Sequence, residues 1–167
     1  TVDSVVDERA FREIYLTSFE KTVKQAQPWT IMCAYNRLNG TYCAENKWLL
    51  TDVLRDEWGF DGVVISDYNA VGELKVHGIA EDYKDAALMA FECGCDIDMM
   101  SAGYCSSLCQ LVEEGKISEE KVDKAVLKVL ELKRALGNTG KHNIFLLNTK
   151  LFHLLGNYKT QSFIIFL

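Results

Sequence analysis

The chain lacks the features that mark membrane proteins and nucleic-acid-binding proteins. Its 167 residues contain no run of 18 apolar side chains, so the sequence predicts no membrane-spanning helix. Lysine and arginine total 18 against 24 acidic residues, which gives a formal net charge of −6. Nucleic acids and anionic membranes attract clustered basic side chains, so an acidic chain without a basic stripe favours neither partner.

Histidine is scarce, and the cysteines are poorly spaced for metal binding. The chain has three His and six Cys, and the short spacings Cys93-x-Cys95 and Cys105-x3-Cys109 have no His near them. Zinc sites need paired spacings with further partners, so we expect no metal and no cofactor. Scattered structural thiols in a reducing compartment are the preferred interpretation. No signal peptide is visible at Thr1, and the thiols lead us to expect a cytoplasmic protein, with secretion as the alternative.

What the sequence does contain is an alternation of helices and strands. Apolar positions recur at helical spacing over residues 7–27, 46–58, 82–94 and 118–137, and more briefly before Gly115. Short apolar runs at residues 30–35, 62–66 and 95–100 predict strands. This order indicates βαβ units, so we expect an α/β fold with three parallel neighbouring strands and helices packed on one face. The stretch after Asp67 predicts a long polar loop.

The strand at residues 62–66 ends at a carboxylate, Asp67. Its run of β-branched residues is typical of a fully buried parallel strand. Acids at the C-terminal ends of barrel strands tend to be catalytic, because that face of a barrel carries the active site. A strand-end Asp that only caps a turn is the alternative, and the spacing alone favours that alternative.

The composition changes at Asn138. All 24 acidic residues precede it, and the last 30 residues show no helix caps or stops. We therefore expect residues 1–137 to form one structural unit. Residues 138–167 are expected to be a divergent tail, either out of frame or disordered, and packing of this tail on the domain is the alternative. The chain also begins without methionine, so we expect a fragment or a processed product.

Several ordered motifs resemble family 3 glycoside hydrolases, with bacterial β-glucosidases as the nearest type. The motifs are Val5-Val6-Asp7-Glu8-Arg9, Arg12-Glu13-Ile14-Tyr15-Leu16, Met32-Cys33-Ala34-Tyr35-Asn36, Asn39-Gly40, residues 49–62 and Val64-Ile65-Ser66-Asp67. The resemblance implies a partial (β/α)8 barrel of the TIM type, reduced to about its last three βα units. It also implies that the other part of the barrel and an α/β sandwich domain, both present in the full-length enzyme, are missing here.

The same resemblance assigns roles to three residues. The family's nucleophile, the Asp of a Ser-Asp-Trp motif, falls on Asp67. Tyr68 stands where the family usually has Trp, and its ring is expected to stack on the sugar. Tyr35 is expected to donate a hydrogen bond that orients Asp67. The implied reaction is retaining hydrolysis of a β-linked glucoside or related oligosaccharide, with the general acid/base outside this chain; a xyloside substrate stays open.

Other polar residues near the expected rim have less specific interpretations. Arg37 and Glu45 either shape the pocket or form an ion pair that fixes a loop, and the ion pair is preferred. His77 is either an aglycone contact or a solvated loop residue. Asp96 and Asp98 share one side of the third predicted strand by their spacing of two, and Asp98 is expected to accept hydrogen bonds at the rim. The competing functional hypotheses are a non-catalytic truncated product and a small-molecule-binding α/β domain.

Overall fold

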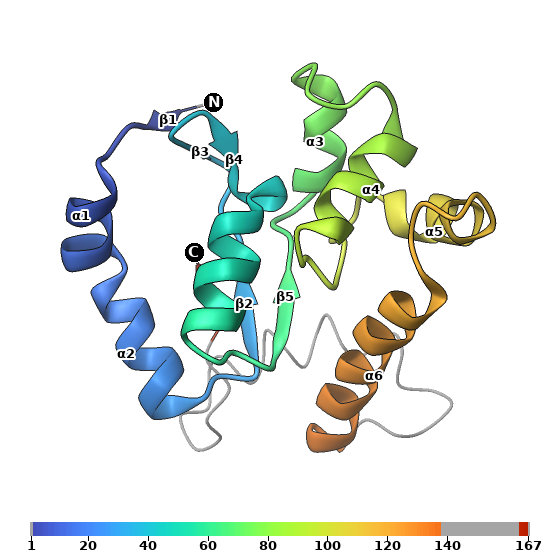
Figure 1. Ribbon diagram of the computed structural model, residues 1–167. Helices are drawn as coiled ribbons and strands as arrows, with labels where there is room; N and C mark the ends of the chain where they lie inside the picture. The colour runs from blue at the N-terminus through green and yellow to red at the C-terminus, as the bar shows by residue number, and fades with distance from the viewer. Residues whose placement is uncertain (1, 138–163, 167) are drawn as a thin grey trace.

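The computed structural model describes residues 2–137 and 164–166. Its central feature is a parallel pair of strands, β2 (Thr30–Met32) and β5 (Val63–Ile65). Thr30 lies opposite Val63 and Met32 opposite Ile65. Figure 1 shows both strands rising toward the hairpin of β3 and β4 and toward α3, so their C-terminal ends share one rim. The predicted parallel pairing of the first two strands is confirmed.

The third predicted strand, at residues 95–100, is only partly correct. Ile97 makes one parallel bridge to Ile65, and no longer strand forms there among the described residues. The Asp96 and Ile97 N–H groups both donate to the Val64 carbonyl, at 2.9 and 3.0 Å, which breaks the regular ladder. On its other side β2 pairs in parallel with β6 (Ile164–Phe166), so the strand order is β5-β2-β6. The other expectations for residues 138–167 concern residues outside the described part of the chain.

Helices account for most of the described chain, and the predicted ones form near their expected bounds. They are α1 (Glu8–Ala10), the π-type η1 (Phe11–Tyr15), α2 (Thr17–Ala26), the π-type η3 (Trp48–Glu57), α3 (Ala70–Val76), α4 (Tyr83–Glu92), α5 (Gly103–Glu113) and α6 (Glu119–Ala135). The side chains of Asp7, Asp82 and Ser118 cap α1, α4 and α6. None of these helices is long and apolar enough to span a membrane.

Two local expectations fail for identifiable reasons. The helical spacing of apolar residues over 7–27 predicts that Ile14 and Tyr15 are buried, but both are exposed, because the π-type turn before Leu16 rotates the helix and buries Leu16 instead. The stretch after Asp67 is not a long loop, since α3 begins three residues later. Its buried positions, Ala70, Val71 and Leu74, follow helical spacing that is short but readable.

The two faces of the strand pair meet different helices. Ile31 and Val64 belong to the main core, which also contains side chains of η3 and α4. Met32, Val63 and Ile65 point the other way and pack with Leu132 of α6. Figure 1 shows η3 beside the strands and α6 on the other side, toward their lower ends. The expectation that helices cover one face only is therefore wrong.

A second, smaller sheet lies at the rim. It consists of β1 (Asp3–Ser4), β3 (Arg37–Leu38) and β4 (Thr41–Tyr42), in the order β1-β3-β4. The Asn39-Gly40 turn between β3 and β4 uses positive φ angles of 51° and 89°, which Asn and Gly tolerate. The hairpin leads through the 3-10 turn η2 (Cys43–Glu45) into η3. This hairpin fixes the loop that follows Tyr35.

The cysteines differ in exposure, and this predicts a labelling pattern. All six are free thiols; Cys105 and Cys109 are exposed, whereas Cys33, Cys43 and Cys95 are buried. Burial raises the pKa of Cys43 to about 12, so it holds almost no thiolate at neutral pH. We expect a disulfide reagent at pH 8 to modify Cys105 and Cys109 first, and the buried thiols only when denaturant is added. Mass spectrometry of the labelled peptides measures this order, and early labelling of Cys43 would contradict the packing described.

Candidate active site

Asp67 lies at the C-terminal end of β5, as the sequence predicts. Ile65 ends the strand, Ser66 is buried, and Asp67 is half-buried at the rim. One carboxylate oxygen, Oδ1, accepts a hydrogen bond of 2.7 Å from the Tyr68 N–H. No cation lies within 4 Å of this carboxylate among residues 2–137. The acid is therefore held by hydrogen bonding rather than by an ion pair.

The structure brings Tyr35, Asp67 and Tyr68 together at the rim. The Tyr35 hydroxyl donates to the main-chain carbonyl of Tyr68 at 2.5 Å. Burial raises the pKa of Tyr35, and the negative charge of the neighbouring Asp67 raises it further. Tyr68 is 58% exposed, so its ring is available to a ligand. Tyr35 thus holds the turn that carries Asp67 through the carbonyl of the next residue.

The Asp67 turn is also fastened to the segment that follows Ile97. The Ser66 N–H donates to the Ile97 carbonyl at 2.9 Å, and the Asn69 N–H donates to the Met99 carbonyl at 2.7 Å. Between them, the Met99 N–H donates to Ser66 Oγ at 2.8 Å. Sequence reasoning missed these contacts, because they join residues about 30 positions apart. The signal available was only the polar residue that directly precedes Asp67.

Two buried thiols lie beneath the same turn. Cys33 follows β2, and its N–H donates to the Ile65 carbonyl at 3.0 Å. A hydrogen bond from the Cys95 thiol lowers the pKa of Cys33, and the main-chain N–H of Asp67 lowers it as well. That shared hydrogen bond and burial raise the pKa of Cys95. Cys33 thus contacts the main chain of Asp67, and Cys95 contacts Cys33. The sequence did not indicate these contacts.

The expected ion pair between Arg37 and Glu45 is wrong. Glu45 instead turns back to its own helix start, where its carboxylate accepts from the Tyr42 N–H at 3.4 Å. The Arg37 guanidinium lies 4.5 Å from the centre of the Tyr42 ring. Burial raises the pKa of Glu45. Hydrogen bonding and ring stacking, rather than opposite charges, fix this loop.

His77 is not a solvated loop residue, and its contact with an aglycone stays a prediction. It follows α3, and its ring stacks on Tyr42 with a centre-to-centre distance of 5.3 Å and an angle of 6°. Its Nε2 lies 3.6 Å from Glu73 Oε2 on the preceding turn. His77 therefore links α3 to the β3–β4 hairpin across the rim.

Asp96 and Asp98 occupy different environments and do not form a catalytic pair. Asp96 accepts from Arg55 at 2.6 Å and from the Val64 N–H at 2.8 Å. Asp98 accepts from Ser101 Oγ at 2.5 Å and from the Tyr104 N–H at 3.2 Å, so it organises the start of α5. The expected hydrogen-bonding role of Asp98 is confirmed. Among the residues that the structure describes, no three His, Cys, Asp or Glu side chains converge to hold a metal ion.

Comparison with known proteins gives a consistent result. The model of the family described as "Glycosyl hydrolase family 3 N terminal domain" matches residues 2–132. Thermostable β-glucosidase B of Acetivibrio thermocellus is 43% identical over 79% of this chain, and an exo-α-(1→6)-L-arabinopyranosidase of Bifidobacterium longum is 43% identical over 78%. The crystal structure of a Listeria innocua β-glucosidase in complex with glucose superposes with a TM-score of 0.77 at 42% identity, over 81% of this chain.

The chain is much shorter than these proteins. It spans 16% of the length of each of the two curated relatives and 19% of the Listeria innocua chain. The mixed helix–strand fold predicted from the sequence agrees with the superposition on the Listeria innocua structure.

Proposed function

The chain belongs to glycosyl hydrolase family 3, and on that premise we propose that it supplies the nucleophile, Asp67, of a retaining β-glucosidase. The observation that carries the proposal is the position of this carboxylate. Asp67 directly follows Ser66 at the C-terminal end of the buried parallel strand β5 and lies with Tyr35 and Tyr68 on the rim where barrel enzymes place their catalytic groups.

The proposed chemistry is a double displacement. A carboxylate oxygen of Asp67 attacks the anomeric carbon, the bond to the aglycone oxygen breaks, and a general acid protonates the departing oxygen. Water, deprotonated by the same acid/base group, then attacks the anomeric carbon and releases Asp67. The turn on which Asp67 lies is held by hydrogen bonds to Tyr35 and to the segment 97–99, and such fixed geometry supports in-line attack.

The proton donor is proposed to come from outside this chain. Retaining enzymes place their two carboxyl groups about 5–5.5 Å apart. The other acids near this rim have structural partners: Asp98 binds Ser101 and Tyr104, and Glu73 lies against His77. The limited share of its relatives that the chain spans supports the same view. Residues 1–137 are proposed to be the last three or so βα units of a barrel whose other part, with a sandwich domain, completes the site.

The proposed substrate is a β-linked glucoside or a related oligosaccharide. Two of the similar proteins named above are β-glucosidases, which supports glucose at the site of cleavage. The exposed ring of Tyr68 beside Asp67 offers a face on which a sugar can stack. The residues that choose between glucosides and xylosides are proposed to lie in a part of the barrel other than residues 1–137.

The isolated chain is expected to be nearly inactive on p-nitrophenyl β-glucoside, because the acids near this rim in the described part of the chain are engaged by other partners and the proton donor is proposed to lie outside it. Release of p-nitrophenol by the purified chain measures this. The positive control is a chimera in which residues 2–137 replace the matching segment of the Listeria innocua β-glucosidase, and this chimera is expected to hydrolyse the substrate. Turnover by the isolated chain at ordinary enzymatic rates would show that an acid of this chain, such as Glu73 or Asp98, completes the pair.

A further inference from the structure

Ser66 is completely buried beside the proposed nucleophile, and its hydroxyl has two partners. Its exposed fraction is 0%. Ser66 Oγ accepts a hydrogen bond of 2.8 Å from the Met99 N–H and donates one of 2.9 Å to the main-chain carbonyl of Asp67. A buried hydroxyl with both partners satisfied is specific to one geometry, because moving either partner leaves a buried polar group without a hydrogen bond.

These contacts place Ser66 between two segments of the rim. Met99 is held on both sides, by Ser66 at its N–H and by Asn69 at its carbonyl. The turn 66–69, which contains Asp67 and Tyr68, is thereby closed onto the segment 97–99. Ser66 is the member of this arrangement whose side chain reaches Asp67 itself, through the carbonyl of that residue.

The backbone that follows Met99 is strained. Met100 and Ala102 have φ values of 73° and 59°, in the left-handed region that side chains with a Cβ rarely adopt. Asn69 has a φ of 58° in the same region, which Asn tolerates. Such residues keep these angles only where the surroundings fix them. Asp98 fixes one side through Ser101 and Tyr104, and Ser66 fixes the other.

We propose that Ser66 is a positioning residue that holds the Asp67 turn against the strained segment 97–102, and so aims the nucleophile. This inference rests on the proposed function of Asp67. Loss of the hydroxyl removes the acceptor of the Met99 N–H and the donor to the Asp67 carbonyl in one step. A small displacement of Asp67 slows attack on the anomeric carbon, whereas sugar binding depends mainly on other groups.

The test uses Ser66→Ala in the chimera described above. We expect kcat to fall by about tenfold or more while KM stays within about twofold, because attack is slowed more than binding. The rate at which a 2-deoxy-2-fluoro-glucosyl fluoride inactivates the enzyme is expected to fall by a similar factor. Ser107→Ala is the matched control: Ser107 is also a buried serine, but its hydroxyl pairs with Ser106 on α5, so kcat is expected to stay unchanged.

If Ser66 only stabilised the fold, Ser66→Ala would lower the unfolding temperature but would not lower kcat while leaving KM nearly unchanged. Unchanged kcat in Ser66→Ala, with Asp67→Ala inactive, overturns the positioning role alone; a fully active Asp67→Ala chimera overturns the proposed function. If Ser66→Ala is insoluble in the chimera, Ser66→Cys keeps the side-chain size with a weaker acceptor and is measured in the same way. In the isolated chain, amide hydrogen exchange at Met99 is expected to be faster in Ser66→Ala. Unchanged exchange would contradict the role given to the hydrogen bond between Ser66 Oγ and the Met99 N–H.

Discussion

Asp67→Ala in the chimera is expected to lower kcat on p-nitrophenyl β-glucoside by about 10⁴-fold or more, which is the scale of losing a covalent nucleophile. Without that carboxylate no glycosyl–enzyme ester forms, and water has to attack directly. The change removes the hydrogen bond from the Tyr68 N–H and the contact with the Tyr35 hydroxyl but no ion pair, so the unfolding temperature is expected to change little.

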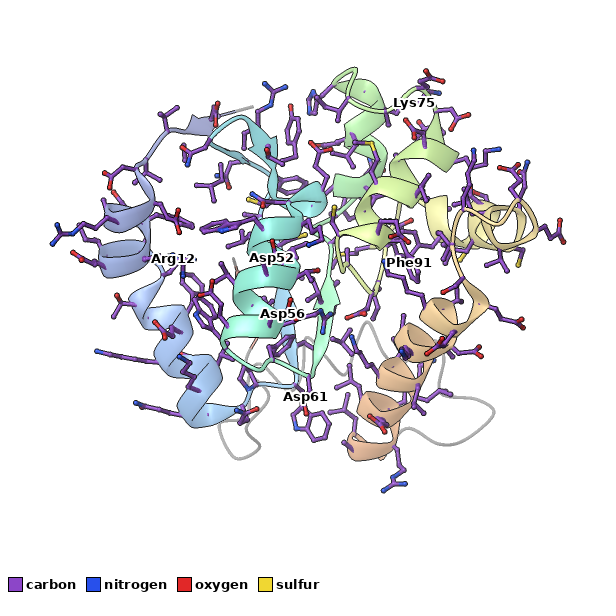
Figure 2. All side chains as sticks on the ribbon, in the orientation of Figure 1. Arg12, Asp52, Asp56, Asp61, Lys75 and Phe91 are labelled. Atoms are coloured by element: carbon purple, nitrogen blue, oxygen red, sulfur yellow. The ribbon has the colours of Figure 1, made fainter. Side chains whose placement is uncertain are left out.

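Asp61→Ala is the matched control for this loss. Asp61 is an exposed carboxylate shortly before β5, and Figure 2 shows it near the lower ends of the strands, away from the rim. Its removal is expected to leave kcat unchanged. If Asp67→Ala kept a tenth or more of the activity, the nucleophile would have to be another residue.

Asp96→Ala is expected to lower the free energy of unfolding of the chain by about 3–5 kcal/mol, the usual result when one partner of a buried charge cluster is removed. The Asp96 side chain is 6% exposed and lies 2.6 Å from Arg55 and 3.3 Å from Lys128. Its removal leaves the Arg55 guanidinium, itself only 14% exposed, without its carboxylate, and the Val64 N–H loses an acceptor. Burial already lowers the pKa of Lys128, which shows how poorly this region solvates charge.

Urea denaturation followed by circular dichroism measures this loss of stability. Asp61→Ala again serves as the control, with an expected change below about 0.5 kcal/mol for an exposed site. Asp96→Asn keeps an acceptor for the Val64 N–H and is expected to lie between the two. A loss below about 1 kcal/mol for Asp96→Ala would contradict the structural role assigned to this cluster.

The sequence was sufficient for the features that depend on local patterns. Caps at Asp7, Asp82 and Ser118 follow from their side chains, and the helices that they begin have apolar residues at regular spacing. The strand that ends at Asp67 was readable because its β-branched run is buried on both faces. Its parallel partner β2 followed from the intervening helix.

The remaining features depend on contacts between distant residues. Asp96 and Asp98 are two positions apart on one predicted strand, so their spacing predicts the same surroundings for both. In the structure Asp96 contacts Arg55, whereas Asp98 contacts the start of α5. Ser66 looked like an ordinary residue before the acid, since its partner Met99 is 33 positions away. The pairing of β2 with β6 joins segments more than 130 positions apart, for which periodicity gives no information.

Covalent trapping tests the assignment of Asp67 most directly. The chimera is incubated with 2-deoxy-2-fluoro-glucosyl fluoride, digested, and its peptides are mapped by mass spectrometry. We expect one added fluoroglucosyl group on the peptide that contains Asp67, and none in Asp67→Ala. A label on any other carboxylate, or turnover of p-nitrophenyl β-glucoside without a label on Asp67, would contradict the assignment.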